Sequence, residues 1–185
     1  MKAKVGLKLN VTYTHRDAIG RIVPIFQENG LFRFLLKHGI ISPNAPKWVI
    51  FGSWTSQKVV PNTVTNVGKA LTAGLLTGDI TNFFDYIAVG TGTTAADVTD
   101  TALQTESATA GLTRAASTNS RVTTDVTNDT AQFVRIFTVT GSVAVTESGI
   151  FDASSSGNML ARQVFSAINV VNGDSLTITW KIDVD

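Results

Sequence analysis

The sequence contains no cysteine and only two histidines, His15 and His38. The missing cysteine excludes disulfide bonds, thiolate metal sites and a cysteine nucleophile. A nucleophilic triad is also disfavoured, because no G-x-S-x-G motif occurs and both histidines lie in the first third of the chain. The histidines show no metal-ligand spacing. Because His15 stands beside Arg16 and Asp17 at a predicted turn, we expect its side chain to be solvated.

Charged residues are scarce and unevenly spread. Asp, Glu, Lys and Arg make up 16% of the chain, below the usual quarter. Residues 1–62 hold nine basic and two acidic side chains, a net charge of +7, whereas residues 63–185 hold six basic and twelve acidic ones, a net charge of −6. This asymmetry indicates halves that attract each other or copies that meet head to tail. Core-type residues interrupt the basic charges, which disfavours nucleic acid as a partner.

Long apolar runs are also missing. None reaches the length of a membrane span, and residues 1–14 alternate instead of forming the apolar core of a signal peptide. The apolar and basic segment at residues 31–41, LFRFLLKHGII, predicts a short helix. We interpret it as a core or subunit contact, with a membrane-surface helix as the alternative.

The remaining pattern is that of a β-protein. Apolar and polar residues alternate from Val5 to Tyr13, which predicts a strand with one buried face. A turn at 17–20 and a second strand at 21–26 would complete an N-terminal hairpin. Threonine supplies much of the polar surface, and its branched Cβ favours strands. We take residues 1–62 as a basic attachment and assembly region.

A short helix is predicted to open the second region, residues 63–185. Thr65 or Asn66 is a suitable N-cap, apolar residues follow at helical spacing, and Gly78 is suited to the C-terminal turn, so the helix spans about 66–77. Asn172-Gly173-Asp174 predicts a turn between the last two strands. Strands are expected at 85–90, 131–145 with a bend near Gly141, 147–152, 159–166 and 175–185.

These elements predict a mainly β fold. Short strands separated by Gly, Ser, Asn and Asp turns favour an antiparallel β-sandwich of the jelly-roll or immunoglobulin-like type. One or two short helices and the N-terminal hairpin or arm complete the prediction.

One stretch matches a nucleotide-binding pattern. Gly90-Thr91-Gly92-Thr93-Thr94-Ala95 fits G-x-G-x-x-A. A pyrophosphate site needs a helix opening at the second glycine and a following parallel strand. Here Asp97 and Asp100 would place carboxylates close to the phosphates, and threonine-rich β-sequence follows. We therefore interpret the motif as a glycine-assisted turn after a strand.

Other candidate chemistry is weaker still. Three acid pairs remain open as acid/base groups, although acids in Thr, Asn and Gly loops usually form turns. They are Asp97 with Asp100, Asp125 with Asp129, and Glu147 with Asp152. No D-x-D-x-D-G calcium motif occurs. Trp48, Trp54 and Trp180 could form a sugar-stacking platform, but Trp180 lies on the apolar face of an alternating strand and is expected in the core.

Three further stretches lie between Val64 and Asp185: VTNVGKALTAGLLTGD, FDYIAVGTGTTAADVTDTALQTE with a later arginine, and the ending VTESGIFDASSSGNMLARQVFSAINVVNGDSLTITWKIDVD. With them, the region from Val64 to Asp185 resembles structural proteins of tailed bacteriophages. The resemblance implies a small helix before a strand, a D-T-A-L-x-x-E segment and an antiparallel β-domain. It contains no catalytic motif, so it implies no catalytic residue, metal ligand or cofactor, and we predict a protein that is not an enzyme.

The resemblance implies a virion protein that is assembled in the host cytoplasm. We expect it to oligomerise and to dock on other phage structural proteins, as a tail- or neck-associated component. A head or capsid decoration protein is one alternative, and a tail-fibre module that binds a carbohydrate receptor on the host surface is another. The candidate assembly contacts are Lys2, Lys4, Lys8, Arg16, Arg21, Phe32, Arg33, Phe34 and Lys37.

Overall fold

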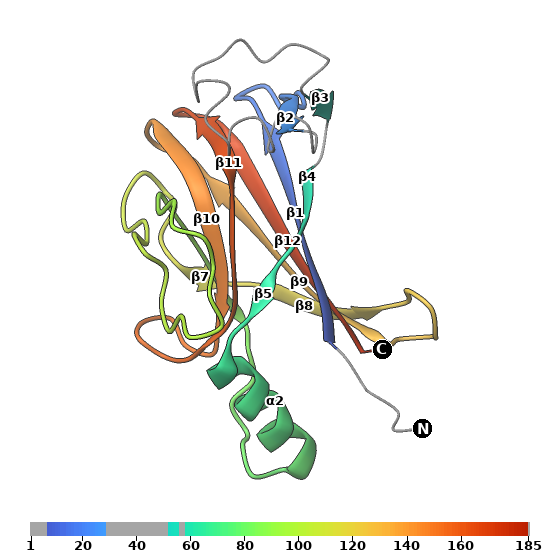
Figure 1. Cartoon of the computed structure of the whole chain (residues 1–185). Helices are drawn as coiled ribbons and strands as arrows, with labels where there is room; N and C mark the ends of the chain where they lie inside the picture. The colour runs from blue at the N-terminus through green and yellow to red at the C-terminus, as the bar shows by residue number, and fades with distance from the viewer. Residues whose placement is uncertain (1–6, 29–51, 56–57, 185) are drawn as a thin grey trace, which may run out of the picture.

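The computed structural model of the chain describes residues 7–28, 52–55 and 58–184. These residues form two five-stranded antiparallel sheets and a separate two-stranded one (Figure 1). The two larger sheets pack face to face, so the predicted β-sandwich is confirmed.

The first sheet is built around a strand from each end of the described chain. Its order is β4-β1-β12-β9-β8. β1 and β12 pair along their whole length, from Leu7 opposite Val184 to Arg16 opposite Ser175. The bounds are β1 Leu7–Arg16, β4 Lys58–Pro61, β8 Thr118–Val122, β9 Thr130–Thr138 and β12 Ser175–Val184.

The second sheet has the order β5-β11-β10-β6-β7. Its bounds are β5 Thr63–Val64, β6 Tyr86–Gly90, β7 Ala115–Ala116, β10 Val143–Phe151 and β11 Met159–Val170. The third sheet pairs β2, Ile25–Glu28, with β3, Gly52–Thr55. Because β1 and β4 belong to the sandwich, it includes residues on both sides of position 62. The division there, and the attachment role of residues 1–62, stay predictions.

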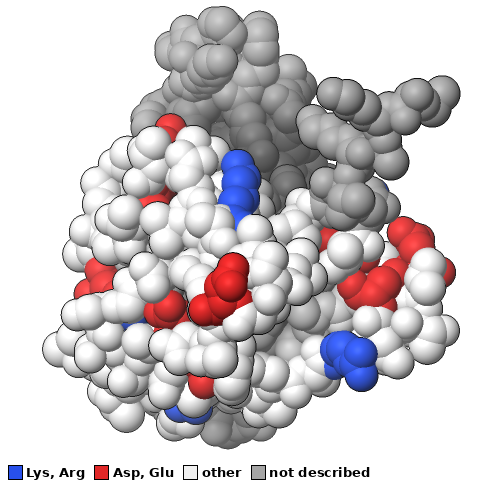
Figure 2. Space-filling view, turned by 90° about the horizontal axis from the view of Figure 1, so that it is seen from below, with Lys and Arg blue, Asp and Glu red and all other residues white. Residues whose placement is uncertain are grey.

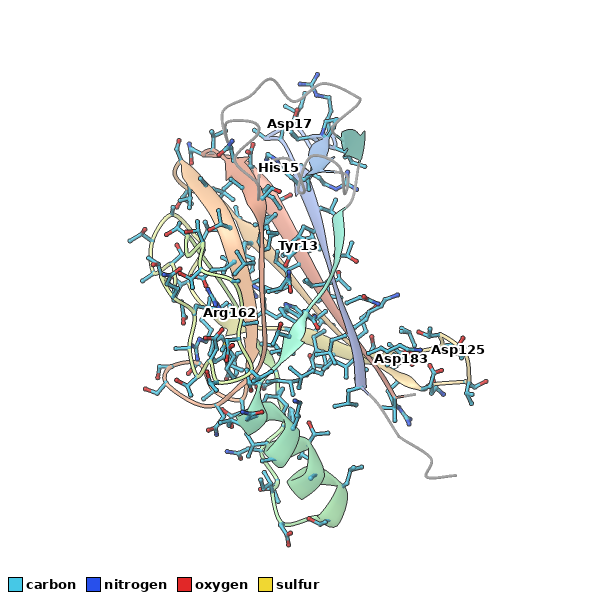
Figure 3. All side chains as sticks on the ribbon, in the orientation of Figure 1. Tyr13, His15, Asp17, Asp125, Arg162 and Asp183 are labelled. Atoms are coloured by element: carbon cyan, nitrogen blue, oxygen red, sulfur yellow. The ribbon has the colours of Figure 1, made fainter. Side chains whose placement is uncertain are left out.

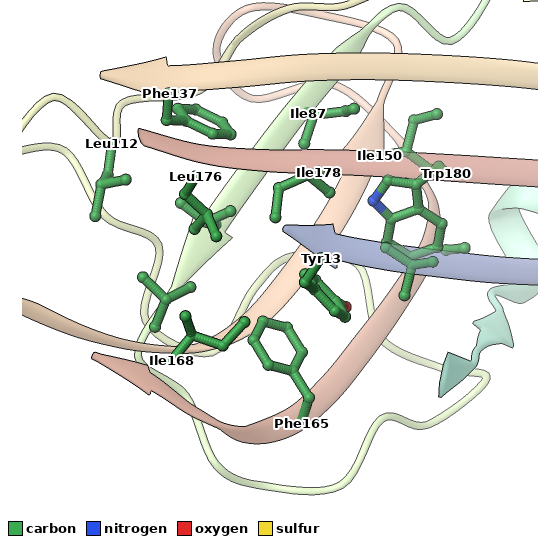
Figure 4. Packing of buried hydrophobic residues seen from close by; sticks show 14 of the residues in the cluster. Tyr13, Ile87, Leu112, Phe137, Ile150, Phe165, Ile168, Leu176, Ile178 and Trp180 are labelled. Atoms are coloured by element: carbon green, nitrogen blue, oxygen red, sulfur yellow. The ribbon is translucent and has the colours of Figure 1, made fainter. Parts of the chain in front are cut away.

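The core lies between the two larger sheets. Tyr13 of β1 and Trp180 of β12 are fully buried and face β10 and β11 (Figure 4). The Tyr13 and Phe165 ring centroids are 3.9 Å apart, and burial raises the pKa of Tyr13. The Trp180 indole Nε1 donates to the Ser148 Oγ at 3.2 Å. The prediction that Trp180 is a core residue is therefore confirmed, while Trp48 lies outside the described residues.

The N-terminal prediction is met in part. β1 buries alternate side chains and the turn at 17–20 is present, with the Gly20 N–H donating to the Asp17 carbonyl at 2.9 Å. Beyond it, Arg16 and Ile22 form a single bridge, and the chain then continues into β2, which pairs with β3. The hairpin is therefore short. The helix predicted at 31–41 lies outside the described residues.

Helix α2, Asn66–Thr77, matches the predicted bounds. The Thr65 Oγ1 accepts from the Gly68 N–H at 2.9 Å, and Gly78 adopts the left-handed conformation, with φ of 77°, that ends the helix. Gly68 packs directly on the Leu160 backbone of β11, where a Cβ would overlap the Leu160 carbonyl. The helix projects from the lower end of the sandwich (Figure 1).

The long strand predicted at 131–145 is wrong in one respect. It is two strands, because the chain leaves the first sheet after β9 and enters the second at β10. The crossing lies around Gly141, where the bend was predicted, and the Thr140 N–H is satisfied by the Ala110 carbonyl. The strand predicted at 147–152 is the second half of β10. The polar edge strand β8 was not predicted, since TNSRV shows no apolar alternation.

Candidate functional site

The sequence motif identified above forms a loop, Thr91–Glu106, which we call the motif loop. The backbone N–H groups that would bind a phosphate donate instead to side chains of the protein. The Gly92 N–H donates to the Glu147 Oε1 at 3.0 Å, and the Thr93 and Thr94 N–H groups donate to the Gln104 Oε1 at 2.8 and 2.9 Å. Residues 91–97 form no helix. The motif is thus a turn after a strand, as its context predicted.

Glu147 holds the motif loop from inside. Its carboxylate is fully buried and also accepts the Gln104 and Thr105 N–H groups, at 3.0 and 2.7 Å. The guanidinium of Arg162, a β11 residue labelled in Figure 3, lies 2.8 Å from the Glu147 Oε2. A buried carboxylate needs such a partner, because an unpaired charge in the interior is strongly destabilising.

Arg162 extends the same cluster to the loop surface. Its Nη1 binds Asp100 at 2.9 Å and its Nη2 donates to the Thr94 carbonyl at 3.1 Å. The guanidinium side chain is nearly inaccessible to solvent. The Glu147–Arg162–Asp100 cluster therefore fixes the motif loop on the sheet. The cluster also explains why position 92 is a glycine, because a Cβ there would lie 2.5 Å from the Glu147 Oε1.

Arg114 closes the far end of the motif loop. It forms two hydrogen bonds with the Glu106 carboxylate, at 2.9 and 2.6 Å, and lies 3.6 Å above the centre of the Phe151 ring. It also donates to the Ala153 and Ser156 carbonyls, at 3.1 and 2.6 Å. The later arginine of the phage resemblance thus joins the motif loop to the loop after β10.

The acid pairs considered from the sequence serve local structure. Asp97 accepts from the Thr99 hydroxyl and N–H, which lowers the pKa of Asp97. Asp129 accepts the Val126, Thr124 and Asp125 N–H groups, which hold the pKa of Asp129 well below its usual range.

The third acid pair, Glu147 and Asp152, does not form a joint site, because each carboxylate binds different partners. Asp152 binds the Asn158 N–H and side-chain amide, at 2.7 and 2.8 Å, whereas Glu147 is enclosed with Arg162. In the described part of the chain, no group of three or more His, Asp and Glu side chains is placed to hold a metal ion.

The prediction that His15 is solvated is wrong. His15 is buried, and its Nε2 lies 2.7 Å from the Asp174 Oδ2, which also accepts the Val171 N–H at 2.9 Å. The signal was present in the sequence: His15 is in phase with Leu9, Val11 and Tyr13, so it points into the core. Together with Asp174 it joins β1 to the turn before β12.

The predicted assembly contacts are described only in part. Lys8 is exposed on β1. The Arg16 guanidinium donates to the Gly20 carbonyl at 2.9 Å, and Arg21 pairs with Asp17 at 2.8 Å, so both brace the β1–β2 turn. The other six lie outside the described residues: Lys2, Lys4, Phe32, Arg33, Phe34 and Lys37.

An exposed apolar helix face was not predicted. Leu71 and Leu75 of α2 pack on the core, while the opposite side exposes Ala70, Ala73 and Leu76, the last with 85% of its surface accessible. Figure 2, viewed from the α2 end, shows a largely uncharged surface with isolated charged groups. The sequence signal was a twelve-residue helix whose single charge is Lys69. Among the residues that the structure describes, none of the helical segments could span a membrane.

A protein-family model decides the identity of the chain. The model described as Podophage GP4 fiber I protein gp80 matches residues 69–182, which include most of α2, the motif loop and the strands through most of β12. The chain belongs to this gp80 fibre family. It is therefore a structural protein of a tailed phage and a virion component, as the resemblance implied. No curated protein and no solved structure matches the chain.

Proposed function

We propose that this gp80-family protein acts by assembly, binding copies of itself and other phage structural proteins in a tail- or neck-associated fibre, without catalysis. The observation that carries the proposal is that charged side chains are buried while large apolar side chains are exposed. The charged groups of the motif, Glu147 and Arg162 above all, are enclosed, whereas large apolar side chains such as Leu76 are exposed. The enclosed charges are already paired within one molecule, whereas exposed apolar groups gain free energy when a partner covers them.

Charge supports the same function at the other end of the sequence. The basic residues 1–62 and the acidic residues 63–185 suit electrostatic docking between neighbouring subunits. We infer that assembly in the host cytoplasm is steered by this attraction and weakens as salt rises, because exposed charges are screened beyond about 8 Å at physiological ionic strength.

Location in the particle tests the proposal. Purified particles should contain the chain by mass spectrometry, and immunogold labelling should place it at the tail or neck. Cross-linking mass spectrometry should then join residues 1–62 to a neighbouring structural protein. Labelling over the whole head would favour the capsid-decoration alternative. Absence of the chain from purified particles, together with turnover of a sugar or ester by the isolated protein, would refute the proposal.

A specific observation favours a second candidate, recognition of a host surface glycan. Asp85 and Asp152 lie in an open pocket of about 210 Å³ beside Phe83, a residue that is 61% exposed. Burial and the Asp152 charge raise the pKa of Asp85. An exposed ring beside carboxylates can stack on a sugar and accept its hydroxyl groups. The pocket is lined by Thr81, Asn82, Phe83, Asp85, Tyr86 and Asp152.

Saturation-transfer NMR with glucose, galactose and N-acetylglucosamine tests this second candidate. Binding through the pocket predicts a signal that Phe83→Ala abolishes and that Val126→Ala, an exposed site on another loop, leaves intact. Equal spectra for Phe83→Ala and the unmodified protein would exclude the pocket.

A further inference from the structure

The contacts of α2 with the sandwich determine which side of the helix faces solvent. Gly68, Leu71 and Leu75 lie toward the sandwich, and Gly74 is covered by Ile80. At 3.6 residues per turn the opposite side carries one continuous face. That face comprises Asn66, Lys69, Ala70, Ala73, Leu76 and Thr77, and all six are exposed.

The two charges of this region lie at opposite ends of the face and have opposite sign. Lys69 is in the second turn. Asp79 follows the helix, and its carboxylate is held at the last turn because the Thr77 hydroxyl donates to it at 2.6 Å. A negative charge thus lies at the position of Thr77, eight residues from Lys69. No opposite charge on the described part of the same molecule is hydrogen-bonded to Asp79.

We propose that this face, Asn66–Thr77 with Asp79, is a contact between two copies of the chain, which pair with antiparallel α2 helices about a two-fold axis at Ala73. The inference rests on the proposed function and names the surface that serves it. With Ala73 on the axis, Leu76 of one copy lies over Ala70 of the other. The same register places Lys69 opposite Thr77, where the Asp79 carboxylate is held.

The face suits its own copy better than an unrelated partner. A two-fold contact requires one patch to complement itself, and opposite charges at equal distances from a central alanine meet that requirement. Alanine at positions 70 and 73 lets two helices approach to about 8 Å, the short end of helix-packing distances. A single helix pair is smaller than a standard interface, so the dimer should be weak and dependent on concentration.

Charge reversal tests the pairing. In sedimentation velocity on the full chain over a concentration series, Lys69→Asp and Asp79→Lys should each weaken dimerisation about tenfold, because each removes two symmetry-related pairs and creates repulsion. The double variant should restore it. Leu76→Asp should weaken it further, whereas Val126→Asp, at another exposed apolar site on the β8–β9 loop, should leave it unchanged.

The absence of cysteine supplies an independent test of the axis. Ala73→Cys introduces a single thiol. On the proposed axis the Cβ atoms of the two introduced cysteines lie within roughly the 3.5–4.5 Å that a disulfide requires. Mild oxidation should convert this variant into a covalent dimer much faster than Val126→Cys.

Three results would overturn the inference: a monomer at all concentrations, an oligomer insensitive to Leu76→Asp and both charge reversals, or equal cross-linking of the two cysteine variants. None of them removes the chain from the particle, so the location experiment still decides the proposed function separately. Correct folding of the variants is verified by an unchanged unfolding midpoint at the lowest concentrations, where every variant is monomeric, because all these side chains are exposed.

Discussion

The motif loop and helix α2 are anchored two residues apart on β11, yet the loop encloses its charged groups and the helix exposes apolar ones. Arg162 draws the loop's polar groups inward, to Glu147, Asp100 and the Thr94 carbonyl. Two residues earlier, Leu160 receives Gly68, and the helix carries apolar side chains outward. One anchor is electrostatic and buried, and the other is a backbone contact without charge. The polar groups of the loop are satisfied within one molecule, whereas the helix leaves apolar side chains exposed to solvent.

The largest loss of stability is expected when the buried ion pair that anchors the motif loop is removed. Arg162→Leu should lower the free energy of unfolding by about 3–5 kcal/mol, because it leaves the Glu147 carboxylate buried without its cation. Arg121→Leu, on the exposed edge strand β8, should change it by less than about 0.5 kcal/mol. Urea unfolding of both variants measures the difference. Adding Glu147→Gln to Arg162→Leu should recover part of the loss, and no recovery would show that the buried charge is not its cause.

The helix anchor should respond to one methyl group. Gly68→Ala should cost about 1–3 kcal/mol, because its Cβ overlaps the Leu160 backbone. Helix propensity alone predicts a gain of about 1 kcal/mol. Gly74→Ala is the matched control, since the flexible Ile80 side chain next to Gly74 can move. Thermal and urea unfolding should therefore separate the two glycines, and a stabilising Gly68→Ala would disprove the close contact.

The helix cap should contribute less. Thr65→Ala removes the acceptor of the Gly68 N–H and should cost about 1 kcal/mol. Thr65→Ser keeps the hydroxyl and should retain most of the stability. Circular dichroism during urea unfolding measures both, and equal losses in the two variants would assign the effect to the threonine methyl group.

The smallest effect is a pH dependence within the loop. The Thr99 hydroxyl and N–H lower the pKa of Asp97 in the folded protein, relative to about 3.9 in the unfolded chain. Ionised Asp97 therefore stabilises the fold above that pH, and the contribution is lost as pH falls toward the folded pKa. The stability difference between the unmodified protein and Asp97→Asn should shrink between pH 5 and about 2. A difference that stays constant would exclude this linkage.

Local patterns predicted the fold well. The period of two in β1 and β12, the Thr65 cap, Gly78 and the Asn172–Asp174 turn each act over a few residues, so they can be read directly from the sequence. The resemblance named the phage class because its strings cover the motif loop and the strands around it. What failed was longer in range: the change of sheet between β9 and β10 depends on which strands the chain meets later.

The candidate sites were harder to predict for the same reason. The partner of Glu147 is fifteen residues away on β11, and the partner of His15 is 159 residues away, so neither pair has a spacing motif. His15 was assigned to solvent from its polar neighbours, although its phase along β1 indicated burial. The exposed face of α2 could not be predicted because the sequence does not state which side of an apolar helix the sandwich covers.

The pairing of β1 with β12 also determines when this protein can fold. Leu7 pairs with Val184 and Arg16 pairs with Ser175, so β1 and β12 can pair only after residues 175–184 have been synthesised. Contacts of such sequence separation are slow to form, on the order of milliseconds to seconds. Until then β1 has only the short strand β4 beside it, and its other edge is open to mispairing that completed subunits avoid.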